Sequence, residues 1–225
     1  YRNCDRTIDN NVLELNKRFA SVTILQSYYT FSRLNAMGYS PVRPIIIPNG
    51  IDQDIFHSQP EDRKIDNRKV KLISVSWSDN PMKGGETFKW LEDHLDWNRY
   101  EYTFVGRTQT PLTRAKHLPA VASKPLADII REHDIFVFCS QKESCSNALM
   151  EALSCGLPVV YLDDGSNSEV TTFGGARYTS HNDLIPAIES VTRHYSHYKR
   201  LLPELDIQQV ADRYLETARM IVNAY

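Results

Sequence analysis

The sequence has little that would mark a secreted, membrane-spanning or nucleic-acid-binding protein. Its 225 residues include only four cysteines, without a Cys-x-x-Cys pair, and the first residues lack the pattern of a signal peptide. No apolar run approaches the roughly 20 residues of a membrane span. The net charge of -2 leaves no broad basic field for nucleic acid. We therefore expect a cytoplasmic protein with reduced cysteines, and leave open a peripheral association with a membrane.

Several nucleotide-binding and catalytic motifs are also missing. No G-x-G-x-x-G follows the first apolar strand, and the chain has neither a G-x-x-x-x-G-K-[ST] loop nor a G-x-S-x-G elbow. Cys145 has no partner histidine that the sequence identifies. His194 and His197 belong to a polar helix face, and Asp163 and Asp164 are interpreted as a turn or helix cap. The sequence therefore predicts no metal site, no NAD site and no serine or cysteine nucleophile.

Apolar strands alternate with helices from residue 70 onward. We predict strands at 70–76, 100–106, 119–123, 134–140 and 157–162, with helices at 84–95, 125–133 and 146–156 and two long amphipathic helices at the end. Such buried strands are typical of a parallel sheet that helices cover on both faces. With right-handed crossovers, the expected fold class is α/β, a doubly wound, Rossmann-like domain.

The first 40 residues form a separate unit in this interpretation. A helix at 8–20, a strand at 21–25 and a helix at 27–38 that Gly38 ends are followed by a proline-rich connector at 41–48. Asn49-Gly50 predicts a tight turn, and 58–69 a polar surface loop. The main domain then covers 49–205. The last segment, 206–225, is a helix with Asp206 as its N-cap. Its apolar stripe comprises Val210, Tyr214, Ala218 and Ile221.

Unusual side chains follow the predicted strands, where ligands bind in sheets of this class. Lys83 precedes Gly84-Gly85 at a helix start, and Gly106-Arg107 ends a strand. A glycine permits close backbone approach, and an arginine can form a fork onto phosphate. For Lys83, a solvated loop lysine is an equally good interpretation of the local sequence.

Glu151 raises a problem of its own. It lies in a helix that is apolar nearly all round, and an ionised carboxylate is unfavourable there unless it is paired. Glu143 lies eight residues earlier, directly after a strand and before a helix start at 144–147. The question that these residues raise is what pairs with Glu151, and why Glu143 precedes it by eight residues.

The segment "ESCSNALMEALSCGLPVV" resembles the E-x7-E region of retaining glycosyltransferases of family four, which have the two-domain GT-B fold. Other segments agree in order: "IIIPNGIDQDIF" resembles the interdomain linker, "LISVSWSDNPMKGGE" the start of the donor domain, "YTFVG" its second strand, and "LADIIREHDIFVFCS" the approach to the motif. The similarity runs from about Ile8 to Gly175. It implies a transferase of the hexosyltransferase type that moves a sugar from a UDP or GDP sugar to a glycan, lipid or similar acceptor, without a metal or other cofactor.

The resemblance also implies roles for individual residues. Glu143 would contact the transferred sugar and Lys83 would stabilise the diphosphate leaving group, as the catalytic pair. Glu151 would bind the ribose hydroxyls. The remaining donor-binding residues implied are Ser144, Cys145, Ser146, Asn147, Gly106, Arg107, Val121 and Ala122.

The chain departs from the family pattern in three places. Ser76-Trp77-Ser78 stands where the family has an arginine, and Ser144-Cys145-Ser146 replaces a glycine-aromatic-glycine turn. Residues 1–40 resemble only the end of the N-terminal acceptor domain, so a longer protein or a second chain would complete the enzyme, and this fragment alone could be inactive. Residues 206–225 would pack toward that N-terminal part. Two other classes stay open: a non-catalytic nucleotide-sugar-binding module, and a GT-B-type epimerase or phosphorylase.

Overall fold

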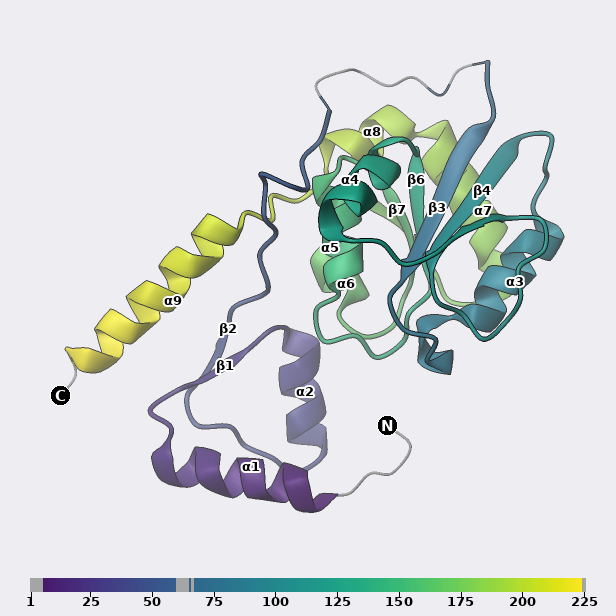
Figure 1. Ribbon diagram of the computed structural model, residues 1–225. Helices are drawn as coiled ribbons and strands as arrows, with labels where there is room; N and C mark the ends of the chain where they lie inside the picture. Colours follow the sequence, from purple (N-terminus) through teal and green to yellow (C-terminus); the bar gives the residue numbers. More distant parts are fainter. Residues whose placement is uncertain (1–5, 60–64, 66, 224–225) are drawn as a thin grey trace.

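Four apolar runs of the sequence and two more-polar edge strands form a six-stranded parallel sheet (Figure 1). A computed structural model describes residues 6–59, 65 and 67–223. The strands are β3 (Val70–Ser76), β4 (Tyr100–Gly106), β5 (Lys116–Leu118), β6 (Ile135–Phe138), β7 (Val159–Leu162) and β8 (Gly175–Tyr178). Their order across the sheet is β5-β4-β3-β6-β7-β8. This order, with every strand parallel, confirms the doubly wound, Rossmann-like class.

Helices cover both faces of this sheet, which explains why its central strands carry apolar side chains on both faces. One face carries α3 (Gly85–His94), α7 (His181–Arg193) and α8 (Tyr195–Arg200), and the other carries α4 (Ser123–Arg131), α5 (Asn147–Ser154) and α6 (Asn167–Thr171). Successive strand residues point to opposite faces. In β3, for example, Leu72 packs under α3 while Ile73 packs under α4 and α5, and neither side chain is exposed.

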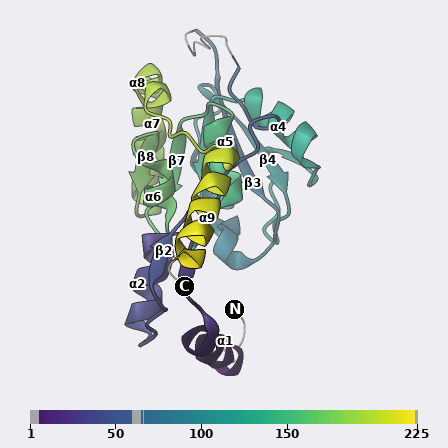
Figure 2. The same ribbon diagram turned by 90° about the vertical axis from the view of Figure 1, so that its left-hand side faces the viewer.

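A smaller N-terminal part lies beyond one end of the sheet. It consists of α1 (Arg6–Phe19), β1 (Thr23–Leu25), α2 (Tyr28–Ala36) and β2 (Pro44–Ile46), with β1 and β2 paired in parallel. The last helix, α9 (Ile207–Val222), extends from the six-stranded domain past β2 (Figure 2), where Arg213 donates a hydrogen bond to the carbonyl oxygen of Ile46 at 2.6 Å. Asp206 is its N-cap and accepts from the amide of Gln208. The apolar stripe of α9 is largely exposed, with Tyr214 and Ala218 at the surface.

Three sequence predictions about local structure are wrong. The third strand of the sheet is Lys116–Leu118 rather than 119–123, because these residues pair with β4 and the following Pro119 has no amide to donate. The end of the chain contains the edge strand β8 and three helices, where two long helices were expected.

The expected tight turn at Asn49-Gly50 is the third error, and its cause is a close contact. The chain is extended there, and the amide of Ile51 donates to the carbonyl oxygen of Leu205 at 2.7 Å. A Cβ atom on Gly50 would lie 2.5 Å from the Cα atom of Ile207. The glycine therefore allows two segments to cross, and no turn requires it.

Some predictions lie partly outside the described residues. The polar loop predicted at 58–69 includes residues 60–64 and 66, and the cysteine prediction includes Cys4. Cys139, Cys145 and Cys155 are free thiols. The part of the chain that the structure describes contains no helix long and apolar enough to cross a membrane.

Candidate active site

The sheet reverses its winding between β3 and β6, and the loops that follow these two strands lie side by side. In α/β sheets of this order, ligands bind outside the carboxyl ends of the strands at such a point. After β3 comes the short 3-10 helix η1 (Pro81–Lys83), and after β6 comes the loop 139–146 that leads into α5. The amide of Gln141 donates to the carbonyl oxygen of Met82 at 2.8 Å, which joins the two loops directly.

Gly84 brings Lys83 into this junction. Its backbone is left-handed, with φ +88°, and a Cβ atom there would lie 2.4 Å from Cβ of Cys139. Only glycine allows both the left-handed turn and this contact. The turn ends η1 and begins α3, so that Lys83 stands beside the loop after β6 rather than in solvent.

Glu143 is the partner of Lys83. The lysine Nζ atom lies 2.5 Å from Oε1 of Glu143, and the two side chains are 35% and 16% exposed. The backbone of Glu143 is held from the other side by the turn after β7, since Ser166 donates its amide to the carbonyl oxygen of Glu143 at 2.9 Å. A Cβ atom on Gly165 would lie 2.6 Å from the amide nitrogen of Glu143. The structure thus brings together two residues that are 60 positions apart and that were both predicted as site residues.

The first turn of α5 stands next to this pair. Ser146 occupies the N-cap position but its hydroxyl group makes no capping hydrogen bond, which leaves the first amides of α5 without a side-chain acceptor in the described structure. Asn49 fixes the loop from the connector, because its Nδ2 atom donates to Oδ1 of Asn147 at 3.0 Å and to the carbonyl oxygen of Cys145 at 3.4 Å. Free amides at a helix start favour an anionic or hydroxyl ligand.

Glu151 lies on the second turn of α5 and is half-buried. Burial raises the pKa of its carboxyl group above the usual value for glutamate. No hydrogen bond or ion pair reaches this side chain from the described residues. The Glu151 carboxylate is therefore partly shielded from water and lacks, among the described residues, the hydrogen-bond partner that the sequence suggested it would need.

Arg107 and Trp77 lie at the neighbouring strand ends. Gly106 has φ +121°, and a Cβ atom there would lie 1.9 Å from the carbonyl oxygen of Ser76, so that β4 ends in direct contact with β3. The guanidinium carbon of Arg107 lies 5.6 Å from the centroid of the Trp77 ring. Arg107 and Lys83 line one cavity of about 110 Å³ beside the start of α3.

Val121 and Ala122 lie in the segment before α4. Ala122 is the N-cap residue of this helix, and Val121 packs on the apolar cluster beneath α4 and α5. Asp163, at the end of β7, forms an ion pair with Arg177 at 3.2 Å, as a turn residue would. Within the described ranges, no group of three or more His, Cys, Asp or Glu side chains is arranged to hold a metal ion.

Sequence reasoning missed two residues that shape the site. Asn49 was interpreted only as a turn residue, although it holds the 145–147 backbone. Glu169 was not singled out. Its two carboxylate oxygens accept the amides of Tyr28 and Tyr29 at 2.8 and 2.7 Å, which ties the start of α2 to the six-stranded domain. A carboxylate at a helix N-terminus is favourable, but the sequence gives no sign of which helix it will meet.

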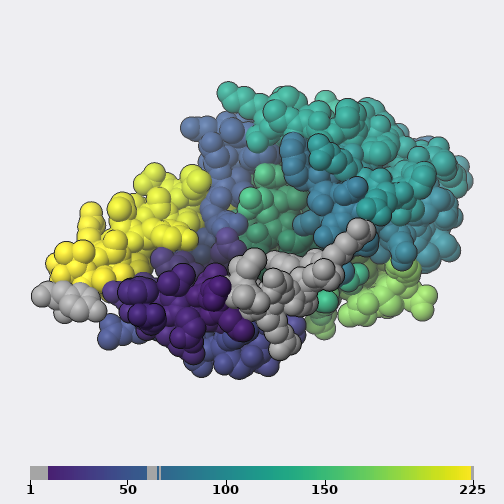
Figure 3. All heavy atoms as spheres, turned by 60° about the horizontal axis from the view of Figure 1, so that its bottom comes forward, coloured from purple at the N-terminus to yellow at the C-terminus, as the bar shows by residue number. Residues whose placement is uncertain are grey.

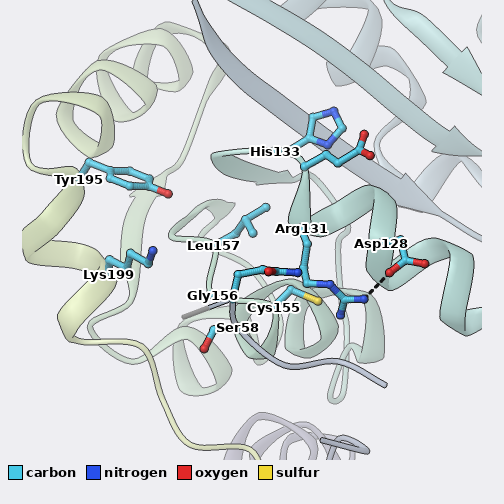
Figure 4. A pocket seen from close by; sticks show the side chains of 11 residues that line it. Ser58, Asp128, Arg131, His133, Cys155, Gly156, Leu157, Tyr195 and Lys199 are labelled. Atoms are coloured by element: carbon cyan, nitrogen blue, oxygen red, sulfur yellow. Dashed lines mark hydrogen bonds and ion pairs between the residues drawn. The ribbon is translucent and has the colours of Figure 1, made fainter. Parts of the chain in front are cut away.

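A larger cavity of about 420 Å³ lies at the opposite end of the sheet, among the residues labelled in Figure 4. Two of its polar side chains, Arg131 and His133, already have structural partners. Arg131 binds Asp128 at 2.5 Å and the carbonyl oxygen of Ile55 at 2.9 Å. His133 bonds to the carbonyl oxygen of Ile129 and to the hydroxyl group of Thr103, and burial lowers its pKa. This cavity lies at the amino ends of the strands, so we place the candidate site at the switch point instead.

Comparison with known proteins defines the class. The family described as glycosyl transferases group 1 matches residues 69–194, more than half of the chain, and the protein belongs to this family. No curated protein sequence matches it.

Solved structures share the fold. Anabaena HepE, solved in complex with UDP, is 18% identical with a TM-score of 0.78, and the match covers 97% of this chain and 69% of that one. Sucrose-phosphate synthase from Thermosynechococcus elongatus is 15% identical with a TM-score of 0.75, and a glycosyltransferase from Rickettsia africae is 12% identical with a TM-score of 0.73. All of this chain matches 65% of the synthase, and 95% of it matches 67% of the Rickettsia protein. The six-stranded domain thus corresponds to the Rossmann-like half of a GT-B glycosyltransferase.

Proposed function

We propose that this chain carries the donor-binding half of a retaining glycosyltransferase of family four. It would move a sugar from a nucleotide-diphosphate donor to a glycan, a lipid or a similar acceptor. The observation that carries the proposal is the arrangement at the switch point: the Lys83–Glu143 pair stands beside the free amides of α5, and the unpaired Glu151 lies one turn further along that helix.

Each part of this arrangement suits a part of the donor. When the bond from the sugar to the diphosphate breaks, negative charge grows on the leaving phosphate, and a fixed cation such as Lys83 stabilises it. Glu143 and the amides of 144–147 would face the sugar hydroxyl groups. Glu151 would accept hydrogen bonds from the ribose hydroxyl groups, which would supply the partners that the protein does not. Cationic side chains and helix amides would neutralise the diphosphate without a metal ion.

The donor is of the UDP or GDP type in this proposal. HepE was solved with UDP and with UDP-glucose, and this similarity in fold favours testing uridine nucleotides first. The nucleobase of the donor would lie near Val121 and Ala122, in the segment that precedes α4.

A further N-terminal domain would complete the enzyme, either within a longer protein or from a second chain. The two-stranded β1-β2 sheet is too small for independent stability. Figure 3 shows α1 and α9 at the surface of the molecule. Large apolar side chains are exposed on α1 (Val12, Leu15, Phe19) and on α9 (Ile207, Tyr214, Leu215, Met220, Val222). Such faces mark surfaces that another element covers.

Calorimetric titration tests the nucleotide site. UDP and GDP should be titrated into the protein and into Glu151→Ala, with Glu101→Ala as the control because Glu101 is an exposed carboxylate on β4. Losing hydrogen bonds to a charged group should weaken nucleotide binding about 10-fold or more. The control should bind as the unaltered protein does. Absence of binding to both nucleotides, or equal binding by Glu151→Ala, would contradict the site.

A non-catalytic nucleotide-sugar-binding module is the second candidate, and Trp77 favours it because an indole ring cannot supply the charge of an arginine. Incubation of the complete protein with a donor sugar and candidate acceptors separates the two. Release of the nucleotide with a new glycosidic product supports transfer, and binding without turnover supports the module. An epimerase or phosphorylase would instead be recognised by its product.

A further inference from the structure

An exposed tryptophan stands at the end of the central strand. Trp77 follows β3 directly and is 66% exposed, although a large aromatic ring is normally buried or in contact with a partner. The strand end beneath it is rigid, because the hydroxyl group of Ser76 donates to the carbonyl oxygen of Ser78 at 2.6 Å. The ring therefore projects from a fixed backbone at the edge of the candidate site.

Arg107 covers this ring. Its guanidinium carbon is 5.6 Å from the ring centroid, within the range of a cation–π contact. The Arg107 backbone is fixed against the same strand, since its amide donates to the carbonyl oxygen of Ser76 at 2.8 Å. Its side chain is exposed and forms no ion pair with a carboxylate among the described residues. The tryptophan ring is thus what limits the positions that this guanidinium group takes.

The cavity that Arg107 shares with Lys83 needs a second positive charge if it is to receive a diphosphate. Glu143 neutralises Lys83 at 2.5 Å. Its lining also includes hydroxyl groups, among them those of Ser78 and Thr108, and the exposed carboxylates of Asp79 and Glu86. Arg107 is therefore the cation of this cavity whose charge no ion pair cancels, within the residues that the structure describes.

We propose that Trp77 is a positioning residue that holds Arg107 over this cavity, and that Arg107 binds a phosphate group of the donor there. This inference rests on the proposed function and assigns a different role to each of the two residues. Arg107 contacts the phosphate. Trp77 contacts only the guanidinium group and restricts it to the orientation that reaches the cavity.

The test compares UDP with uridine, which has the same base and ribose but no phosphate. Arg107→Ala should weaken UDP binding about 10-fold or more, and the loss should shrink at high salt. Trp77→Ala should weaken UDP binding about 2- to 5-fold, and Trp77→Phe should restore most of that loss because phenylalanine also accepts a cation–π contact. Binding of uridine, followed by saturation-transfer NMR, should be the same in all variants. If GDP is the nucleotide that binds, GDP and guanosine take these places.

A double variant separates positioning from direct contact. Adding Trp77→Ala to Arg107→Ala should cause no further loss of UDP affinity. Arg114→Ala is the matched control, because Arg114 stacks on Trp97 at 4.6 Å and does not line the cavity. It should leave UDP affinity unchanged.

The outcomes distinguish this inference from the proposed function. If Glu151→Ala weakens UDP binding while Arg107→Ala and Trp77→Ala do not, the positioning proposal is wrong and the nucleotide site stands. If Trp77→Ala weakens uridine binding as well, or adds its full loss to Arg107→Ala, the ring contacts the nucleotide directly and the positioning role is wrong. If neither UDP nor GDP binds the unaltered protein, both proposals fail.

Discussion

Replacing Glu143 with glutamine should strengthen the binding of UDP, because Glu143 competes with a diphosphate for Lys83. The lysine Nζ atom lies 2.5 Å from Oε1 of Glu143. A phosphate that binds Lys83 has to displace or share this carboxylate, and it also meets the negative charge of Glu143 at close range. The neutral amide of Glu143→Gln removes both effects while it keeps the size of the side chain.

The size of the gain follows from the exposure of the pair. The lysine side chain is 35% exposed and the glutamate side chain 16%. Fully exposed ion pairs stabilise proteins by about 0.2–1 kcal/mol, and partial burial places this pair near the top of that range. Relief of about 1 kcal/mol corresponds to UDP binding that is about 5-fold tighter. A UDP sugar should gain less or lose affinity, because the variant also changes the group proposed to contact the sugar hydroxyls.

Calorimetry at low and at physiological salt measures the affinity for UDP and the affinity for UDP-glucose. The expected result is tighter UDP binding and a lower ratio of UDP-glucose affinity to UDP affinity. Glu132→Gln is the control, since Glu132 lines the cavity at the other end of the sheet. In a Lys83→Ala background the gain in UDP affinity from Glu143→Gln should shrink. Weaker UDP binding by Glu143→Gln alone would refute the reasoning and would show that the carboxylate positions Lys83 for the phosphate.

Three predictions concern stability, each measured by chemical denaturation. Burial raises the folded-state pKa of Glu151 above its unfolded value, so ionisation opposes folding as the pH rises. The variant Glu151→Gln should therefore be more stable than the unaltered protein at pH 7 by about 1 kcal/mol. A gain in stability that persists unchanged below the unfolded pKa would contradict this explanation. Burial acts to raise the pKa of Glu92, but hydrogen bonds from the amides of 113–115 lower it overall. That stabilisation is present above the unfolded pKa and is lost as the pH falls through the folded one, so Glu92→Gln should be less stable by about 2 kcal/mol at pH 7, with a gap that narrows in acid. Gly106→Ala should lose more than about 3 kcal/mol of stability because its Cβ atom would lie 1.9 Å from the Ser76 carbonyl oxygen. Gly38→Ala, where φ is +82° and no atom is near, should lose only about 1–2 kcal/mol. Equal losses would show that backbone strain alone determines the loss of stability at both glycines.

Strands that are buried on both faces were predictable, and edge strands were not. The runs that became β3, β4, β6 and β7 carry apolar side chains on both faces because helices cover both sides of them. β5 contains Lys116 and His117, and β8 contains Arg177, so neither shows the apolar run that signals a strand. Their strand conformation comes from pairing with the neighbouring strand, which is a tertiary effect.

The sequence could propose residues for the candidate site but could not predict which of them make contact. Lys83 and Glu143 could each be identified because they follow buried strands, and the strand order then decides that they meet. No local sequence pattern predicts this order of the strands in the sheet. The same holds for Arg107 on Trp77 and for Glu169 at the start of α2, since each contact joins segments whose proximity only the fold determines.

The crossing at Gly50 has a mechanical consequence. The chain passes between the N-terminal part and the six-stranded domain twice, at residues 47–51 on the way in and at 205–207 on the way out. Backbone hydrogen bonds join the two passages, from the amide of Ile51 to Leu205 at 2.7 Å and from the amide of Ile207 to Ile51 at 3.1 Å. One peptide crossing would let the two parts swivel about it, whereas two crossings bonded side by side resist twisting and leave bending as the easy motion. The N-terminal part would then open and close over the carboxyl ends of the strands by bending about one axis.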